Sequence, residues 1–113
     1  MHELSIVQNI VTIVVDEAKR VGATSVKTIR IRAGALRGIV PQQLQFSFEF
    51  VKTGTIVEDA TLELEVLPIR ATCKACSCEF GVENYEMICP ECKSKDLDLI
   101  QGMELDVKEI EIE

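Results

Sequence analysis

The sequence predicts an α+β protein in which a small helix-and-sheet domain carries an inserted module built around four cysteines. Apolar residues recur every three or four positions near the start of the chain, and they alternate with polar residues in several later segments. Four of the five cysteines form two Cys-x-x-Cys pairs. The 113 residues allow one ordinary domain, or a smaller domain with a metal-stabilised module that could not bury enough apolar surface alone. We expect the second arrangement.

The first element is expected to be an amphipathic helix that ends at Gly22. Lys19 and Arg20 place positive charge near the negative end of its dipole. Because β-branched residues are mediocre helix formers, packing of the apolar stripe must hold this helix. The stripe recurs at alternating steps of three and four residues and consists of Leu4, Val7, Val11, Val14, Ala18 and Val21.

Two segments, 27–33 and 61–67, have the period-two alternation of strands. In the first, Ile29, Ile31 and Ala33 share a face, and Gly34 and Gly38 then mark a loop. In the second we expect the apolar residues to point inward, namely Leu62, Leu64 and Val66, with Glu63 and Glu65 outward. Pro68 ends the pairing.

The segment 42–51 fits both periods. Its four apolar residues Leu44, Phe46, Phe48 and Phe50 alternate strictly, yet Leu44, Phe48 and Val51 also share one helical face. We predict a helix, because Pro41 would occupy its first position, where the missing N–H costs nothing, and Gly54 lies just beyond its end. A strand is the alternative.

The last part of the chain is expected to return to the first sheet. A short strand over 96–101 would close the cysteine module, and Gly102 would turn the chain. In the final strand, Leu105 and Val107 have one parity and Ile110 and Ile112 the other, which predicts a bulge or bend near Lys108 and Glu109. The module is therefore predicted to be an insertion.

The two cysteine pairs predict a structural zinc ribbon. Cys73 and Cys76 are followed, after twelve residues, by Cys89 and Cys92, a spacing at which four thiolates can close around one ion. Four sulfurs leave no coordination position for water, so this site builds structure and does not activate a nucleophile. Cys78 is the leftover thiol; it could replace Cys76, but the matched pairs favour the other four. A redox pair or ordinary buried thiols are the alternative.

Charge and composition restrict the function further. The formal charge of -7 and the lack of a basic or aromatic patch around the cysteines argue against a nucleic-acid-binding ribbon. No apolar run approaches the ~20 residues of a membrane span. With an odd cysteine count and no signal sequence, the expected compartment is the cytoplasm. With one histidine and no nucleophile-base pair, we expect no enzymatic activity.

The start of the chain is a second candidate metal site. His2 is the only histidine, and the terminal amine of Met1, the main-chain nitrogen of residue 2 and the imidazole Nδ1 can chelate one cation in two fused rings. Such nitrogen donors suit Ni(II) or Cu(II), with Glu3 as a further donor through its nitrogen or its carboxylate. The alternative is a solvated histidine at a chain end, with Glu3 complementing the dipole of the following helix.

Three features together carry a family resemblance: the start Met1-His2-Glu3-Leu4-Ser5, the segment 34–48 and the cysteine pattern. Through them the chain resembles the HypA family of hydrogenase nickel-incorporation proteins over essentially its whole length. The resemblance implies a nickel metallochaperone with a nickel-binding domain over 1–70 plus 102–113 and a zinc-ribbon domain over 71–101. It assigns nickel to Met1, His2 and Glu3, and zinc to Cys73, Cys76, Cys89 and Cys92. Val40 stands near a position where some members add a nickel donor.

The resemblance also implies partners: a HypB-type GTPase and the precursor of the [NiFe]-hydrogenase large subunit. A homodimer is conceivable through a sheet edge or through exchange of the ribbon. The rival interpretation is a zinc-ribbon adaptor that binds protein or nucleic acid and carries no nickel. A thiol oxidoreductase would instead need a reactive, metal-free cysteine pair.

Overall fold

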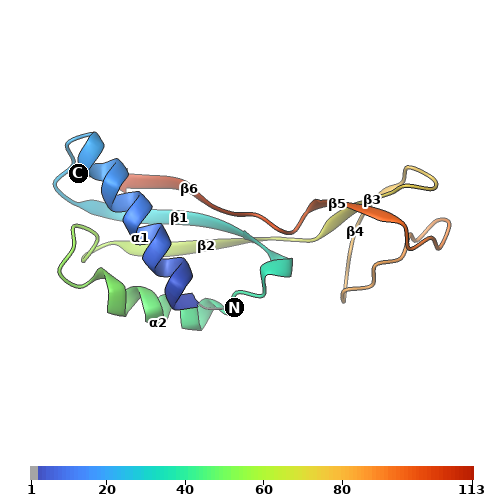
Figure 1. Ribbon diagram of the computed structural model, residues 1–113, viewed down its shortest axis with the longest axis horizontal. Coiled ribbons are helices and arrows are strands. Elements are labelled where there is room, and N and C mark those ends of the chain that lie inside the picture. Colours follow the sequence, from blue (N-terminus) through green and yellow to red (C-terminus); the bar gives the residue numbers. More distant parts are fainter. Residues whose placement is uncertain (1–2) are drawn as a thin grey trace. The chain divides into compact units, whose positions relative to one another are not determined.

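In the computed structural model, which describes residues 3–113, the chain folds into two compact units (Figure 1). The first contains the chain up to Arg32 with Ile39–Glu65 and Asp106–Glu113, and the second contains Ala33–Gly38 and Val66–Leu105. Both helices and strands are present, so the predicted α+β class is confirmed. The domain limits predicted from the sequence stay a prediction, because compactness does not test which segments fold alone.

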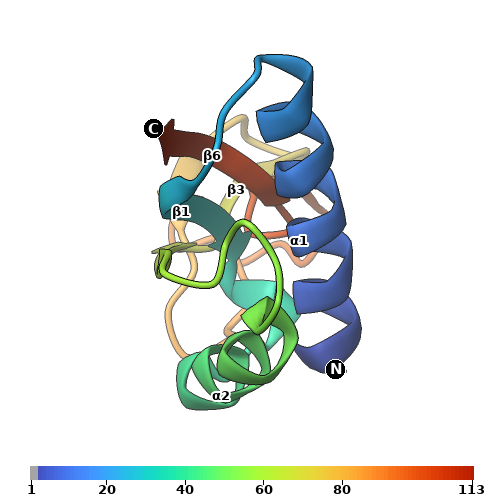
Figure 2. The same cartoon turned by 90° about the vertical axis from the view of Figure 1, so that its left-hand side faces the viewer.

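The first unit is built on a three-stranded sheet in the order β2-β1-β6. These strands are β1 (Val26–Gly34), β2 (Thr61–Leu67) and β6 (Leu105–Ile112). Helix α1 (Glu3–Arg20) lies across one face of the sheet, and α2 (Pro41–Lys52) packs against α1 (Figures 1 and 2). The last strand thus returns to the first sheet, as predicted. Within residues 3–113, no helix has the length and hydropathy needed to cross a membrane.

Helix α1 buries most of the predicted stripe, with two corrections. Its buried apolar residues are Ile6, Val7, Ile10, Val11, Val14 and Ala18. Leu4 and Val21, expected in the core, are nearly half exposed. Val21 follows the last residue of the helix, and Leu4 lies at the margin of a stripe that is centred nearer Ile6 and Ile10. Similarly, Val66 is half exposed, because it lies beyond Glu65, where the first unit ends.

The ambiguous segment is helical, so the predicted helix α2 is confirmed and the strand is excluded. Pro41 occupies the first turn, where its missing N–H breaks no bond. Leu44 and Phe48 are fully buried, whereas Phe46 and Phe50 are 76% and 75% exposed. The choice between the two periods is thus decided by which side chains meet α1 and the sheet.

Strand β6 contains the predicted irregularity. Lys108 reaches Glu65 of β2 (Nζ to Oε2, 3.7 Å), and the next residue, Glu109, pairs with Arg30 of β1 (Oε1 to Nη1, 2.8 Å). Glu65 and Glu63 are two residues apart on β2 and so share a face of the sheet, and Glu63 also pairs with Arg30. The side chains of Lys108 and Glu109, consecutive in β6, therefore reach the same face. Regular alternation would place them on opposite faces, so β6 departs from it at Lys108 and Glu109, where the sequence predicts a bulge or bend.

The second unit is a smaller antiparallel sheet in the order β4-β3-β5. Its strands are β3 (Arg70–Cys73), β4 (Glu79–Gly81) and β5 (Leu97–Gln101). Strand β5 was predicted, whereas β3 and β4 are too short to show a period in the sequence. The apolar core is small and consists of Ile69, Ala71 and Val82, packed by half-buried neighbours such as Phe80 and Leu97.

Two chain segments cross closely at Gly34, where β1 ends and the short helix η1 (Ala35–Arg37) begins. The Gly34 N–H donates to the carbonyl of Glu104 at 2.7 Å, and the Leu36 N–H donates to that of Gly102 at 2.9 Å. A Cβ on residue 34 would lie 2.0 Å from the carbonyl carbon of Gly102, closer than any contact allows. This position therefore requires glycine, for reasons of space.

Candidate metal sites

The two cysteine pairs lie in two turns with the same main-chain hydrogen bonds. In each turn the first cysteine donates its N–H to the carbonyl five residues on, and its carbonyl accepts the N–H four residues on. The residue that supplies this last N–H has a positive φ in both turns, 64° at Ser77 and 65° at Lys93. The chain thus builds one turn geometry twice, and each copy aims two sulfurs to the same side.

The four sulfur atoms converge on one point. The Sγ atoms of Cys73, Cys76, Cys89 and Cys92 all lie within 4.8 Å of one another. The Cys73 and Cys92 sulfurs are 3.5 Å apart, as are those of Cys76 and Cys89. A zinc ion bound at about 2.3 Å by four sulfurs would separate them by about 3.8 Å, so the donor set fits a tetrahedral Zn²⁺.

Main-chain N–H groups favour the ionised form of the first cysteine of each turn. Those of Cys92 and Glu91 lower the pKa of the Cys89 thiol to about 6, and that of Cys76 lowers the pKa of Cys73. The N–H of Cys78 acts to lower the pKa of Cys76, but the neighbouring Cys89 sulfur and burial outweigh it and raise this pKa to about 12. Four thiolates this close repel one another, so a bound cation is what would let all four ionise.

Cys78 lies outside this cluster. Its sulfur contacts the carbonyl of Glu79 at 3.8 Å, and its own carbonyl accepts the N–H of Cys73 at 2.8 Å. Cys73 and Cys89 are buried, and no cysteine of the described chain forms a disulfide. The structure therefore brings together the four cysteines of the matched pairs and gives Cys78 a main-chain role in the first turn.

Of the predicted nickel donors, Met1 and His2 lie outside the described residues, and Glu3 is the first residue of α1. The Glu3 side chain is only 7% exposed, and its carboxylate Oε2 accepts the main-chain N–H of Val40 at 3.1 Å. The carboxylate is thus committed to the protein, which favours the main-chain nitrogen of Glu3 over its side chain as a metal donor.

The contact between Glu3 and Val40 was not predicted, although the sequence holds a signal for it. Val40 is the N-cap residue of α2, and its side chain cannot accept a hydrogen bond from the first turn. A helix that begins at Val-Pro without Ser, Thr, Asp or Asn needs an acceptor from elsewhere in the chain. Glu3 accepts one unpaired N–H at this helix end, that of Val40 itself, and its carboxylate also complements the positive end of the α2 dipole.

Comparisons with known proteins agree with this arrangement. Residues 1–112 match the family described as "Hydrogenase/urease nickel incorporation, metallochaperone, hypA". The hydrogenase maturation factor HypA of Trichodesmium erythraeum is 41% identical over 113 residues, all of this chain and 96% of the relative. That of Aquifex aeolicus is 35% identical, over all of this chain and 98% of the relative.

The fold also resembles a solved structure. The solution structure of the Ni metallochaperone HypA from Helicobacter pylori superposes with a TM-score of 0.71, covering 99% of this chain and 97% of that one. At 24% sequence identity this likeness shows the fold alone.

Proposed function

Since the chain belongs to the HypA family of metallochaperones for nickel incorporation, we propose that it binds Ni(II) at its amino terminus and delivers it during maturation of a [NiFe]-hydrogenase. The observation that carries the proposal is the position of the only histidine, which is residue 2 of a chain that matches the family along its length. The names of the curated relatives favour a hydrogenase as the recipient.

The proposed nickel donors are the amine of Met1, the main-chain nitrogen and imidazole of His2, and the main-chain nitrogen of Glu3. Nitrogen donors in a tetragonal arrangement suit Ni(II). A helix does not use the N–H groups of its first turn in its own hydrogen-bond ladder, so coordination at the start of α1 breaks no helical bond. Donors at a chain end can also exchange stepwise with an acceptor, which release of a cargo requires.

The proposed zinc ligands are Cys73, Cys76, Cys89 and Cys92, whose sulfurs already cluster. Zn²⁺ there would stabilise the fold of the second unit and offer no open coordination position. This division, with a permanent ion held by sulfur and a transferable ion held by nitrogen, suits a carrier protein and needs no catalytic group. We propose accordingly that the protein is not an enzyme.

The proposed partners are a HypB-type GTPase and the precursor of the hydrogenase large subunit, both acting with this protein in the cytoplasm. The family's role in hydrogenase maturation supports this assignment. A homodimer formed by exchange of the ribbon belongs to the same proposal.

The test measures the affinity for Ni(II) by titration calorimetry on three zinc-loaded forms: the untagged protein, the protein with an acetylated amino terminus, and His2→Ala. Loss of binding in both altered forms is the expected result, because acetylation removes the amine donor and the substitution removes the imidazole. Phe46→Ala serves as a control, since its side chain is exposed on α2 and takes no part in the proposed site.

Two other results would contradict the proposed nickel site. Equal affinity in all three forms would place nickel at another site of the chain. Absence of binding in every form, with zinc retained, would favour an adaptor that carries no nickel.

A further inference from the structure

The three-stranded sheet of the first unit has two edges that differ in their surroundings. At the β2 edge, the Gln45 side chain of α2 donates from Nε2 to the carbonyl of Leu62 at 2.7 Å, so a helix supplies a partner to that strand. At the opposite edge, β6 pairs with β1 on its inner side, and no strand of the described chain pairs with its outer side. An open strand edge offers a row of main-chain donors and acceptors.

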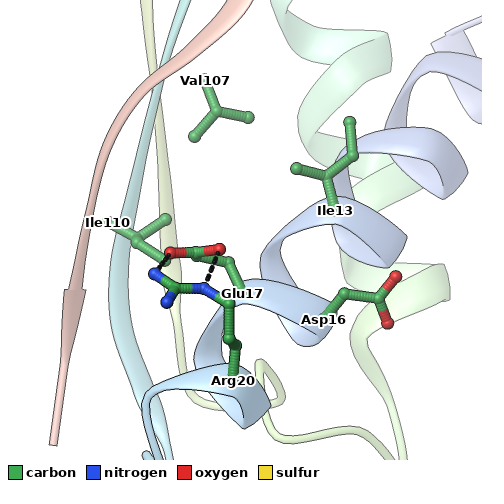
Figure 3. A pocket seen from close by; sticks show the side chains of 6 residues that line it. All are labelled: Ile13, Asp16, Glu17, Arg20, Val107 and Ile110. Atoms are coloured by element: carbon green, nitrogen blue, oxygen red, sulfur yellow. Dashed lines mark hydrogen bonds and ion pairs between the residues drawn. The ribbon is translucent and has the colours of Figure 1, made fainter.

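An apolar hollow lies beside this open edge, between β6 and α1. Its volume is about 570 Å³, and Figure 3 shows Val107 and Ile110 of β6 facing Ile13 of α1. Ile13 is 57% exposed, although it lies next to the sheet. A strand added to β6 would place every second side chain over this hollow, because side chains alternate between the two faces of a sheet.

The rim of the hollow carries unbalanced negative charge. Glu17 and Arg20 form an ion pair with each other (Figure 3). Asp16, also on the rim, has no hydrogen bond or ion pair within residues 3–113. A cationic side chain entering here would find a carboxylate without a partner.

The other face of β6 is acidic as well. Arg30 alone serves three carboxylates, those of Glu63, Glu109 and Glu111. Arg32 binds Asp106 in addition. A second copy paired edge to edge would bring these acidic strands together, in a chain whose formal charge is already -7. Charge therefore selects against a second copy and in favour of a basic strand.

We propose that the outer edge of β6 is a docking site for an extended segment of a partner protein that alternates apolar and basic side chains. Main-chain hydrogen bonds to β6 hold the segment, as in other cases of strand addition. Its apolar side chains cover Ile13, Val107 and Ile110, and its Lys or Arg side chains face Glu109, Glu111 and Asp106 on the opposite face. The break in alternation at Lys108 and Glu109 makes the edge irregular at one point and so favours one register of the added strand.

The probe for this site is the capped peptide Lys-Val-Lys-Val-Lys-Val-Lys, added to the zinc-loaded, ¹⁵N-labelled protein and followed by NMR. The expected result is a set of amide shifts confined to β6 and to the α1 residues around Ile13, with binding that weakens as salt rises. A peptide with Glu in place of every Lys should bind about ten-fold more weakly or not at all, because several cross-strand charge pairs change sign.

Two controls separate strand addition from nonspecific attraction. A Lys-Val peptide with every main-chain nitrogen methylated keeps its charge but loses the hydrogen-bond donors of both strand edges, and it should fail to bind. In the protein, Ile13→Lys should weaken binding about ten-fold, whereas Phe46→Lys, at a still more exposed apolar position on α2, should leave it unchanged.

Equal binding of the methylated peptide, shifts located elsewhere, or no binding at millimolar peptide would overturn the proposal. So would β6 shifts that appear when the protein alone is concentrated, because they would assign the edge to a second copy. None of these measurements involves nickel, so the outcome is independent of the proposed function.

Discussion

Glu3 joins two roles at a single position of the chain. Its main-chain nitrogen belongs to the proposed nickel site, and its carboxylate binds the N–H of Val40 at the start of α2. The first residue of α1, next to the proposed nickel donors Met1 and His2, is thus held to a second helix by its own side chain. At the residue scale this predicts that the stability of the fold and the affinity for nickel respond differently to changes at residue 3.

Glu3→Ala is expected to lower the free energy of unfolding by about 1 to 2 kcal/mol, because the N–H of Val40 loses its acceptor. Glu3→Gln keeps an acceptor oxygen and should cost less than half as much. Urea denaturation of the zinc-loaded proteins measures both values.

The same two variants separate the possible donors of Glu3. Nickel affinity should be retained in Glu3→Gln and in Glu3→Ala, because both variants keep the main-chain nitrogen of residue 3. If Glu3→Gln lost nickel while its stability stayed close to that of the unaltered protein, the carboxylate would be a ligand after all.

At the scale of elements, the sequence predicts those parts whose pattern is repeated over several turns or residues. Helix α1 and strands β1 and β2 follow from period alone, and the irregularity of β6 follows from the change of parity after Val107. Strands β3 and β4, of four and three residues, are too short to show a period. They pair with each other, and β3 also pairs with β5, so their cause is tertiary.

The candidate metal sites, too, are predictable from the sequence only in part. The cysteine cluster is predictable because the spacing of two adjacent turns determines where four sulfurs can meet. The contact of Glu3 with Val40 joins residues 37 positions apart and depends on how α1 packs on α2. A missing cap at Val40 shows that an acceptor is needed, but only the fold shows which residue supplies it.

Two phenylalanines of α2 allow a matched test of whether this segment is a helix. Phe48 is 1% exposed and Phe46 is 76% exposed, two residues away on the same helix. Phe48→Ala should destabilise the protein by about 3 to 5 kcal/mol through the cavity it leaves. Phe46→Ala should change stability by no more than about 0.5 kcal/mol.

Thermal or urea unfolding of the two variants gives this comparison directly. In a strand, side chains two residues apart share a face. Similar losses at both positions would therefore contradict the helix.

At the scale of the whole molecule, the two units depend on different sources of stability. The first has a continuous apolar core that includes Val7, Val14, Ile29, Leu44 and Phe48. The second has only a few buried apolar side chains around Ala71, and its buried Cys73 and Cys89 belong to the sulfur cluster. A core this small needs a metal to hold it, since ordering the chain costs more than so little burial returns.

Removal of zinc should therefore unfold the second unit and leave the first one folded. Hydrogen exchange after treatment with a strong chelator should show lost protection in β3, β4 and β5, and retained protection in α1, α2 and β1. Cys89→Ser should reproduce this pattern without chelator because it removes one ligand of the cluster, whereas Cys78→Ser should not, because its sulfur lies outside the cluster. Retained protection of β3 and β5 without metal would mean that the ribbon folds by apolar burial, and the sulfur cluster would then need another explanation.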